Sequence, residues 1–194
     1  MKRLLTILLG VGVLCVSMPL SATAGMKAYA AIRGGLAIPE FEPDGGDTTK
    51  GKDGALVGAS LGIQPLDFLR WDVIDFSYFN AWQSKSVAGI PAGFGYSNMT
   101  LGTGFRAGYF ADDWKWHPYV SLGLAGNRSI YERDGERKSR WYFQWSVGGG
   151  IEYDIMDRMG IGIRYQFSQS DFDRFNLTER AHRISAEVIV MVFE

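Results

Sequence analysis

The chain has 194 residues, with 20 Lys and Arg against 21 Asp and Glu and a formal net charge of −1. This length suits a single domain, and the even charge balance argues against a nucleic-acid binder, which usually carries a clear basic excess. With 25 glycines and 14% aromatic residues, the composition favours a small β-barrel, which uses glycine at tight interior positions and aromatic residues at a membrane interface.

The opening residues have the three parts of a secretory signal peptide. Lys2 and Arg3 supply the positive start, residues 4–16 form an apolar run, and residues 22–24 (Ala-Thr-Ala) are a small-residue cleavage site. The apolar run is shorter than the roughly 20 residues that a membrane-spanning helix needs. We therefore predict an exported protein, with a signal cleaved after residue 24 and one domain at residues 25–194.

Eight segments after the signal are predicted to be β-strands. Each has the length expected of a tilted strand that crosses the hydrocarbon core of a bilayer, which takes about 9 to 11 residues, whereas soluble sandwiches more often use strands of about 5 to 6. No segment of comparable length has the helical period. The predicted strands are residues 28–38, 54–64, 69–80, 99–110, 119–130, 141–154, 159–168 and 182–193.

The intervals between these strands alternate between long and short without exception. They are residues 39–53, 65–68, 81–98, 111–116, 131–140, 155–158 and 170–180. Short periplasmic turns and longer outer loops are typical of an antiparallel barrel in an outer membrane. The predicted fold is therefore all-β, an eight-stranded antiparallel up-and-down transmembrane β-barrel.

Within the predicted strands the side chains alternate with a period of two. In the second strand Val57 and Leu61 share an apolar face, while Gly58 and Ser60 lie on the other. A polar face turned inward and an apolar face turned outward match a barrel surrounded by lipid. The third strand loses this parity at residues 73–74, where a β-bulge would keep the acids on either side, Asp72 and Asp75, both inside.

Aromatic residues gather near the predicted strand ends, as in the two girdles of a membrane barrel. The girdle at the short turns would hold Phe68, Trp71, Tyr109, Trp114, Trp116 and Tyr153, and that at the long loops Tyr78, Phe79, Trp82, Tyr131 and Trp141.

Several glycine-rich stretches resemble the small outer-membrane β-barrel family, of the OmpA-transmembrane-domain and opacity-protein type. The matching stretches are Ala30–Gly35 (AAIRGG), Leu101–Tyr109 (LGTGFRAGY), Pro118–Gly126 (PYVSLGLAG), Gly148–Tyr153 (GGGIEY) and Ile161–Tyr165 (IGIRY). The resemblance implies outer-membrane lipid, lipopolysaccharide and the barrel assembly machinery as partners, and no cofactor. Such barrels usually end on an aromatic residue, whereas this chain ends Phe193-Glu194, and Phe193 would point inward unless the last strand slips.

Ten charged residues project onto the inner face of the predicted barrel. Five acids against five arginines predict a paired network, because unpaired buried charges are very costly. An eight-stranded barrel is narrow enough for side chains to fill, so we predict a plugged lumen; the alternative is a narrow ion path or gate. The ten residues are Arg33, Arg70, Asp72, Asp75, Arg106, Glu152, Asp154, Arg164, Arg183 and Glu187.

Enzymatic and metal sites have little support in the sequence. Some eight-stranded barrels are lipid A deacylases with a His and a Ser close together, but the spacing of His182 and Ser185 puts them on opposite faces of a strand. The other histidine, His117, is distant, and Cys15 leaves with the signal, so no zinc site is expected.

We therefore predict a non-enzymatic, monomeric barrel with a structural or surface-interaction role, adhesin-like or opacity-like, carried by its outer loops. The second outer loop contains Val87, Ile90 and Phe94, which form a possible contact surface for a host or surface ligand. A narrow channel or porin is the first alternative, and a lipid A-modifying enzyme is the second.

Overall fold

The computed structural model describes residues 26–43, 47–83, 94–133, 136–172 and 177–193. These residues form nine strands, all antiparallel to their neighbours, and no helix among them is long and apolar enough to cross a membrane. The strands are β1 (Lys27–Pro43), β2 (Thr49–Lys50), β3 (Gly54–Leu66), β4 (Leu69–Gln83), β5 (Phe94–Gly108), β6 (Trp116–Arg133), β7 (Glu136–Met156), β8 (Met159–Phe172) and β9 (Leu177–Phe193).

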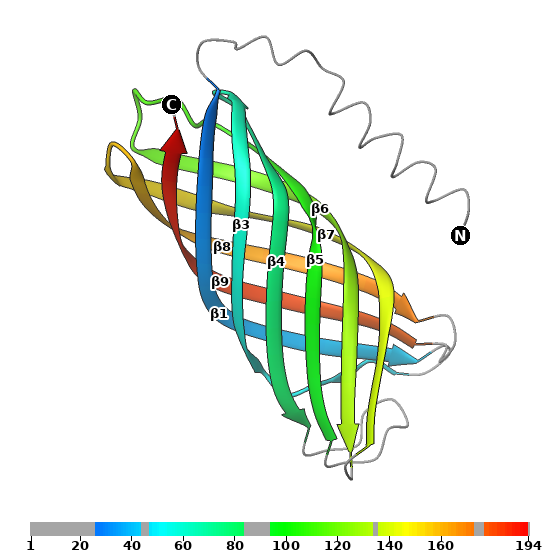
Figure 1. Cartoon of the computed structure of the whole chain (residues 1–194). Helices are drawn as coiled ribbons and strands as arrows, with labels where there is room; N and C mark the ends of the chain where they lie inside the picture. Colours follow the sequence, from blue (N-terminus) through cyan, green and yellow to red (C-terminus); the bar gives the residue numbers. More distant parts are fainter. Residues whose placement is uncertain (1–25, 44–46, 84–93, 134–135, 173–176, 194) are drawn as a thin grey trace, which may run out of the picture.

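Eight long strands close into a barrel (Figure 1), because β1 pairs with β3 on one side and with β9 on the other. The predicted eight-stranded antiparallel barrel is confirmed. The extra strand, β2, is a two-residue addition to β1, with Glu40 opposite Lys50 and Phe41 opposite Thr49. It lies in the interval predicted as the first outer loop, where polar residues gave no strand signal.

Several strands run further toward the long loops than predicted. The β6–β7 ladder continues to Arg133 opposite Glu136, through most of the interval predicted as the third outer loop. On the other side of the barrel β9 begins at Leu177, five residues before the predicted start at His182. The physical reason is that backbone pairing satisfies amide groups whatever the side chains are, so a hairpin can extend beyond its apolar positions. The extension of β9 adds Glu179 to the lumen.

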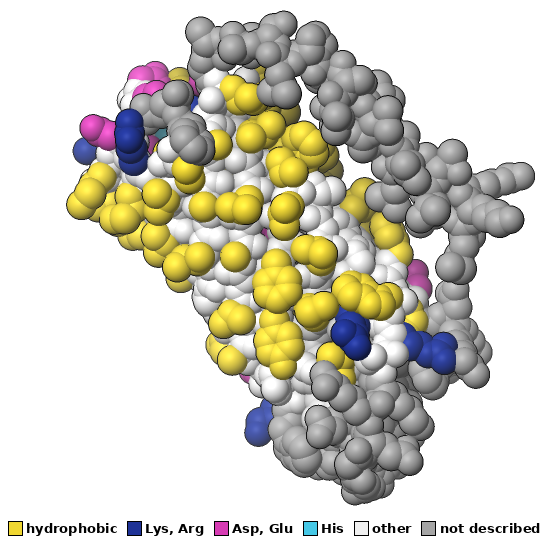
Figure 2. All heavy atoms as spheres, in the orientation of Figure 1, with side chains coloured by type: hydrophobic (Ala, Val, Ile, Leu, Met, Phe, Trp, Pro, Cys, Tyr) yellow, Lys and Arg dark blue, Asp and Glu magenta, His cyan; other side chains and the backbone are white. Residues whose placement is uncertain are grey.

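The large apolar side chains cover the outside of the barrel, as predicted. Ile32 is 65% exposed, Leu122 65% and Ile163 62%, and Figure 2 shows rows of such side chains along the strands. The inward positions are polar and buried, including Arg106 and Asn98, both at 0% exposure. This is the reverse of a soluble domain and is the arrangement that a lipid environment stabilises.

The predicted bulge in β4 is confirmed. Leu61 lies opposite Ile74 and Gly62 opposite Asp72, so one extra residue, Val73, is accommodated in β4. On the outer face Thr103 Oγ1 donates to the carbonyl oxygen of Asp72 at 2.8 Å and accepts from Trp71 Nε1 at 2.7 Å. The bulge therefore keeps Asp72 and Asp75 on the inside, and the Thr103 hydroxyl bonds a backbone carbonyl at the irregular position.

The pairing of the last strand, β9, with β1 is irregular near the C-terminal end of β9. Tyr29 lies opposite Met191, whereas Ala28 lies opposite Phe193, so the pairing of β1 with β9 skips Val192. The alternation that places Glu187 and Ile189 inside the barrel is interrupted at this position. A one-residue slip exchanges the two faces of a strand.

The girdle of aromatic residues at the short turns is present, with Phe68 59% exposed, Trp114 52% and Trp116 49%. At the long loops the prediction was wrong for Phe79, which is 0% exposed and lies in the lumen. The predicted bulge already implied the inward position, because alternation from Asp75 places Phe79 inside as well. The side chains of Trp82 and Tyr131 lie outside the described part of the structure, as does the predicted signal at residues 1–24.

Candidate functional site: the barrel lumen

Arg106 of β5 is the hub of an inner cluster of charged residues, near the short turns. Its Nε lies 3.0 Å from Asp72 Oδ2. Its Nη1 lies 2.8 Å from Glu152 Oε1 and 2.9 Å from Glu187 Oε1. Arg70 also forms an ion pair with Glu152. We call these five residues, which come from β4, β5, β7 and β9, the inner cluster.

Two buried tyrosines complete the bonding of the inner cluster. Tyr29 donates its hydroxyl to Asp72 Oδ1 at 2.8 Å, and Tyr119 donates to Glu187 Oε1 at 2.8 Å. The Arg106 guanidinium also lies over the ring of Tyr119, 5.2 Å from its centroid. The prediction of inner residues considered only charged side chains and therefore did not include these tyrosines. Alternation with a period of two from Arg33 and Ser121 would have placed both inside.

A middle cluster lies next along the lumen, toward the long loops, and consists of Arg33, Asp75, Arg164 and Arg183. Arg33 and Arg164 share Asp75: Arg33 forms an ion pair with it, and Arg164 Nη1 lies 3.4 Å from its Oδ2. Arg33 reaches β4 by crossing Gly58, where a Cβ atom would lie 2.7 Å from the Arg33 Nε. Glycine is therefore required at this close approach.

Arg183 differs from the other lumen arginines because its contacts in the described residues are neutral. Its Nη1 donates to Ser77 Oγ at 3.0 Å. Its Nη2 lies 3.4 Å from Asn98 Oδ1 and 3.3 Å from Gln144 Oε1.

The end of the lumen near the long loops is closed by an outer group of Phe41, Phe79, Tyr96, Asn98 and Glu179. The Tyr96 ring lies 5.3 Å from that of Phe41 and 5.5 Å from that of Phe79. Glu179 accepts a hydrogen bond from Asn98 Nδ2 at 2.9 Å, and another from the Ser129 hydroxyl at 3.1 Å. The sequence reading missed Glu179 because it fell in a predicted loop.

The short-turn end is closed by Phe110, which is 2% exposed. Arg70 lies over its ring at 4.2 Å, and Gln64 Nε2 donates to its carbonyl oxygen at 3.0 Å. Beside it His117 Nε2 lies 2.7 Å from Asp154 Oδ2. Asp154, whose side chain is 37% exposed, thus lies at the mouth of the barrel.

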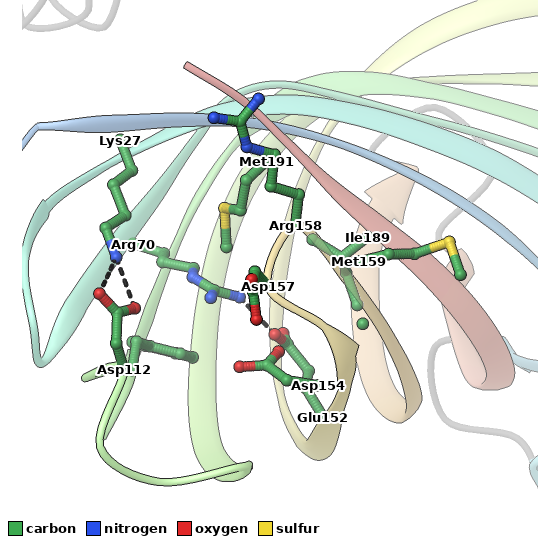
Figure 3. A pocket seen from close by; sticks show the side chains of 12 residues that line it. Lys27, Arg70, Asp112, Glu152, Asp154, Asp157, Arg158, Met159, Ile189 and Met191 are labelled. Carbon is green, nitrogen blue, oxygen red and sulfur yellow. Dashed lines mark hydrogen bonds and ion pairs between the residues drawn. The ribbon is translucent and has the colours of Figure 1, made fainter. Parts of the chain in front are cut away.

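A small pocket opens at this mouth (Figure 3), with a volume of about 20 Å³. Arg70, Glu152 and Asp154 line it from the barrel side, and the ion pair of Lys27 with Asp112 lies at its edge. This volume holds about one water molecule, which is too little for an organic substrate.

The structure thus brings nine of the ten projected residues into the inner and middle clusters. They are Arg33, Arg70, Asp72, Asp75, Arg106, Glu152, Arg164, Arg183 and Glu187, while Asp154 pairs with His117 at the mouth. Of the loop residues, Val87 and Ile90 lie outside the described residues, and Phe94 is described only through its backbone pairing with Gln83.

His182 and Ser185 lie on opposite faces of β9. Ser185 is buried in the lumen at 4% exposure, whereas His182 Nδ1 is 2.7 Å from the hydroxyl of Tyr165 on the outer face. The described residues also contain no group of three or more His, Cys, Asp or Glu placed to hold a metal ion.

Comparison of the sequence with family models gives one match, to the outer membrane protein beta-barrel domain, over residues 6–188. The chain belongs to this family. A search of curated proteins gives no match. Family membership implies the bacterial outer membrane as the location, and the outward apolar face and inward polar face of the barrel agree with it.

Solved outer-membrane barrels share the fold at low identity. Neisserial surface protein A is 16% identical with a TM-score of 0.62, covering 86% of this chain and 98% of its own. Ail, the attachment invasion locus protein of Yersinia pestis, is 14% identical with a TM-score of 0.50, covering 84% and 99%. The outer membrane protease OmpT from Escherichia coli is 8% identical with a TM-score of 0.50, covering 87% and 99%. Since one of the three is a protease, the fold alone does not decide whether this chain is an enzyme.

Proposed function

We propose that this protein is a non-enzymatic outer-membrane barrel with a plugged lumen, and that its outer loops carry a structural or surface-interaction role. The proposal rests on one observation: side chains fill the lumen at successive levels along its axis. Phe110 closes one end, the inner and middle clusters follow, and Phe41, Phe79 and Tyr96 meet near the other end. A pore needs a continuous wet path, and side chains buried at each of these levels do not leave one.

A surface role is supported by what remains outside the plug. Two pairs join β1 and β9 at the long-loop end: Arg180 Nη1 lies 2.6 Å from Glu42 Oε2, an ion pair, and His182 Nε2 lies 3.8 Å from Glu40 Oε2, a pair that is ionic only when the histidine is protonated. These pairs support a stable rim on which loops are displayed. The printed name of Ail, which refers to attachment, adds an analogy at the level of the fold.

Loop replacement tests the surface role. A Gly/Ser graft in place of residues 86–93 removes Val87 and Ile90 but keeps Phe94, which pairs with Gln83 at the start of β5. We expect this variant to fold normally and to lose binding to host cells or surface ligands. A Gly/Ser graft of residues 173–176, in the last outer loop, is the matched control. Undiminished binding by the first graft, at equal surface display, would refute a role for the second loop.

Conductance in planar bilayers tests the plug against the narrow channel. We expect the purified wild-type barrel to give no discrete conductance steps in symmetric salt. Regular conductance steps from folded protein that is free of other porins would refute the plugged lumen and support the narrow channel.

Mass spectrometry of lipid A, from cells with and without the protein, tests the enzyme alternative. The positions of His182 outside and Ser185 inside give no acyl-transfer pair on β9, so we expect identical lipid A. A change in acylation that depends on the protein would establish an enzyme.

A further inference from the structure

Three arginines from three strands converge on three consecutive residues of β4. Arg164 of β8 reaches Asp75, and Arg33 of β1 reaches both Asp75 and the carbonyl oxygen of Phe76, the latter at 3.0 Å. Arg183 of β9 reaches the hydroxyl of Ser77 at 3.0 Å. The three guanidinium groups of the middle cluster therefore lie close together around a short piece of β4.

Each of these buried guanidinium groups keeps one nitrogen without a partner among the described residues. The nitrogens are Arg33 Nη1, Arg164 Nε and Arg183 Nε, and the Ser60 hydroxyl is unpartnered as well. Ser60 lies directly opposite Asp75 in the β3–β4 ladder, so its hydroxyl belongs to the same level. Buried donors of this kind are normally satisfied, because an unsatisfied one costs on the order of 1 to 3 kcal/mol.

The charge at this level is also unbalanced. Asp75 is the carboxylate shared by Arg33 and Arg164, and Asp72, the next acid, lies 3.9 Å from Arg164. Asn98 lies between Glu179 and Arg183, because it donates to Glu179 and accepts from Arg183. Asp75 thus pairs with two of the three cations, whereas Arg183 contacts no carboxylate among the described residues, and buried charge is costly unless it is paired.

Solvent reaches one side chain at this level. The Asp75 side chain keeps 17% of its surface exposed, although its ion-pair partners all lie in the lumen, whereas Asp72 in the inner cluster keeps 1%. A site where three buried guanidinium groups keep unpartnered N–H donors has the chemistry of an anion site.

We propose that the middle cluster binds one small monovalent anion, of the halide or nitrate class, between Arg33, Arg164 and Arg183. The anion accepts hydrogen bonds from the unpartnered N–H groups and supplies the negative charge that is absent from the contacts of Arg183. It acts as a structural ion that completes the plug. Arg70 and Arg106 need no such ion, because no nitrogen of either is among the buried unpartnered atoms of the described residues.

Bromide locates the site directly. The wild-type chain is refolded in sodium bromide, so that the ion enters before the lumen closes, and crystals are measured at the bromine absorption edge. We expect an anomalous peak in the lumen within hydrogen-bonding distance of Arg183 Nε. Ordered water at that position, without an anomalous peak, would overturn the proposal.

Stability measurements give a second, independent test. The urea midpoint of protein refolded in sodium chloride, bromide or nitrate is compared with that in sodium gluconate, a bulky anion, at equal ionic strength. We expect the midpoint to rise with the concentration of the small anion and to saturate, and we expect Arg183→Gln to abolish this dependence.

The matched control is Arg180→Gln, on the same strand, which removes a cation paired with Glu42 at the rim and should keep the saturable dependence. If Arg183→Gln does not fold, Ser60→Ala removes one donor and should weaken the anion dependence severalfold. If the variant that folds, Arg183→Gln or Ser60→Ala, shows the same anion dependence as the wild type, the site is refuted.

Discussion

Arg106 of β5 and Glu187 of β9 meet across the lumen with Nη1 and Oε1 2.9 Å apart, and neither side chain has any exposed surface. Arg106 also bonds Asp72 and Glu152, so one guanidinium joins three carboxylates from three strands. Removing such a partner leaves uncompensated charge in a buried place, which is strongly destabilising.

The first prediction is that Arg106→Met lowers the free energy of unfolding by about 3 to 5 kcal/mol. Urea titration of the refolded barrel measures it, and the double variant Arg106→Met with Glu187→Gln should recover part of the loss. Arg140→Met, at an exposed position near the long loops, is the control. An Arg106→Met barrel as stable as the wild type would show that the inner cluster does not depend on its hub.

The second prediction concerns the bulge in β4. Thr103→Val removes the hydroxyl that bonds the carbonyl oxygen of Asp72 and the Trp71 indole, with almost no change in shape. We expect a loss of about 1 to 3 kcal/mol in urea stability, because both groups lose a hydrogen bond in an apolar setting. Thr103→Ser keeps the hydroxyl and should stay near the wild type; equal losses in the two variants would assign the effect to packing.

The third prediction concerns the outer group. Glu179→Leu removes the charged acceptor that Asn98 Nδ2 and the Ser129 hydroxyl share, so we expect about 1 to 3 kcal/mol of destabilisation. Amide exchange should rise most in β5, β6 and β9 near the long loops. Glu179→Gln retains one acceptor oxygen and should lose less. Unchanged exchange at that end in Glu179→Leu would show that Glu179 does not hold these strands together.

The fourth prediction concerns export and insertion. Fractionation should place the protein in the outer membrane, with a mature N-terminus at Gly25, and its gel mobility should change on heating because unheated barrels often stay folded. Mass spectrometry of the purified protein reads the cleavage site. A soluble periplasmic form without a mobility change would contradict insertion. An inserted protein that still carries residues 1–24 would contradict only the predicted cleavage.

Much of the architecture followed from patterns that are local in the chain. The period of two places Val57 and Leu61 outside and Ser60 inside, and the pair Val73-Ile74 signals the bulge without any tertiary information. Both are consequences of strand geometry acting on neighbouring residues, so the sequence by itself determined the barrel, its polarity and the bulge.

The lumen contacts were decided by the tertiary structure. The sequence identified Arg106 as an inner charge, but the closed barrel decided that three carboxylates bond it. Glu179 entered the lumen because β9 extends beyond its apolar positions. Which inner side chains meet depends on the tilt and stagger of eight strands around a closed barrel. Tilt and stagger depend on the complete ring of hydrogen bonds between strands, so the sequence of any single strand does not determine them.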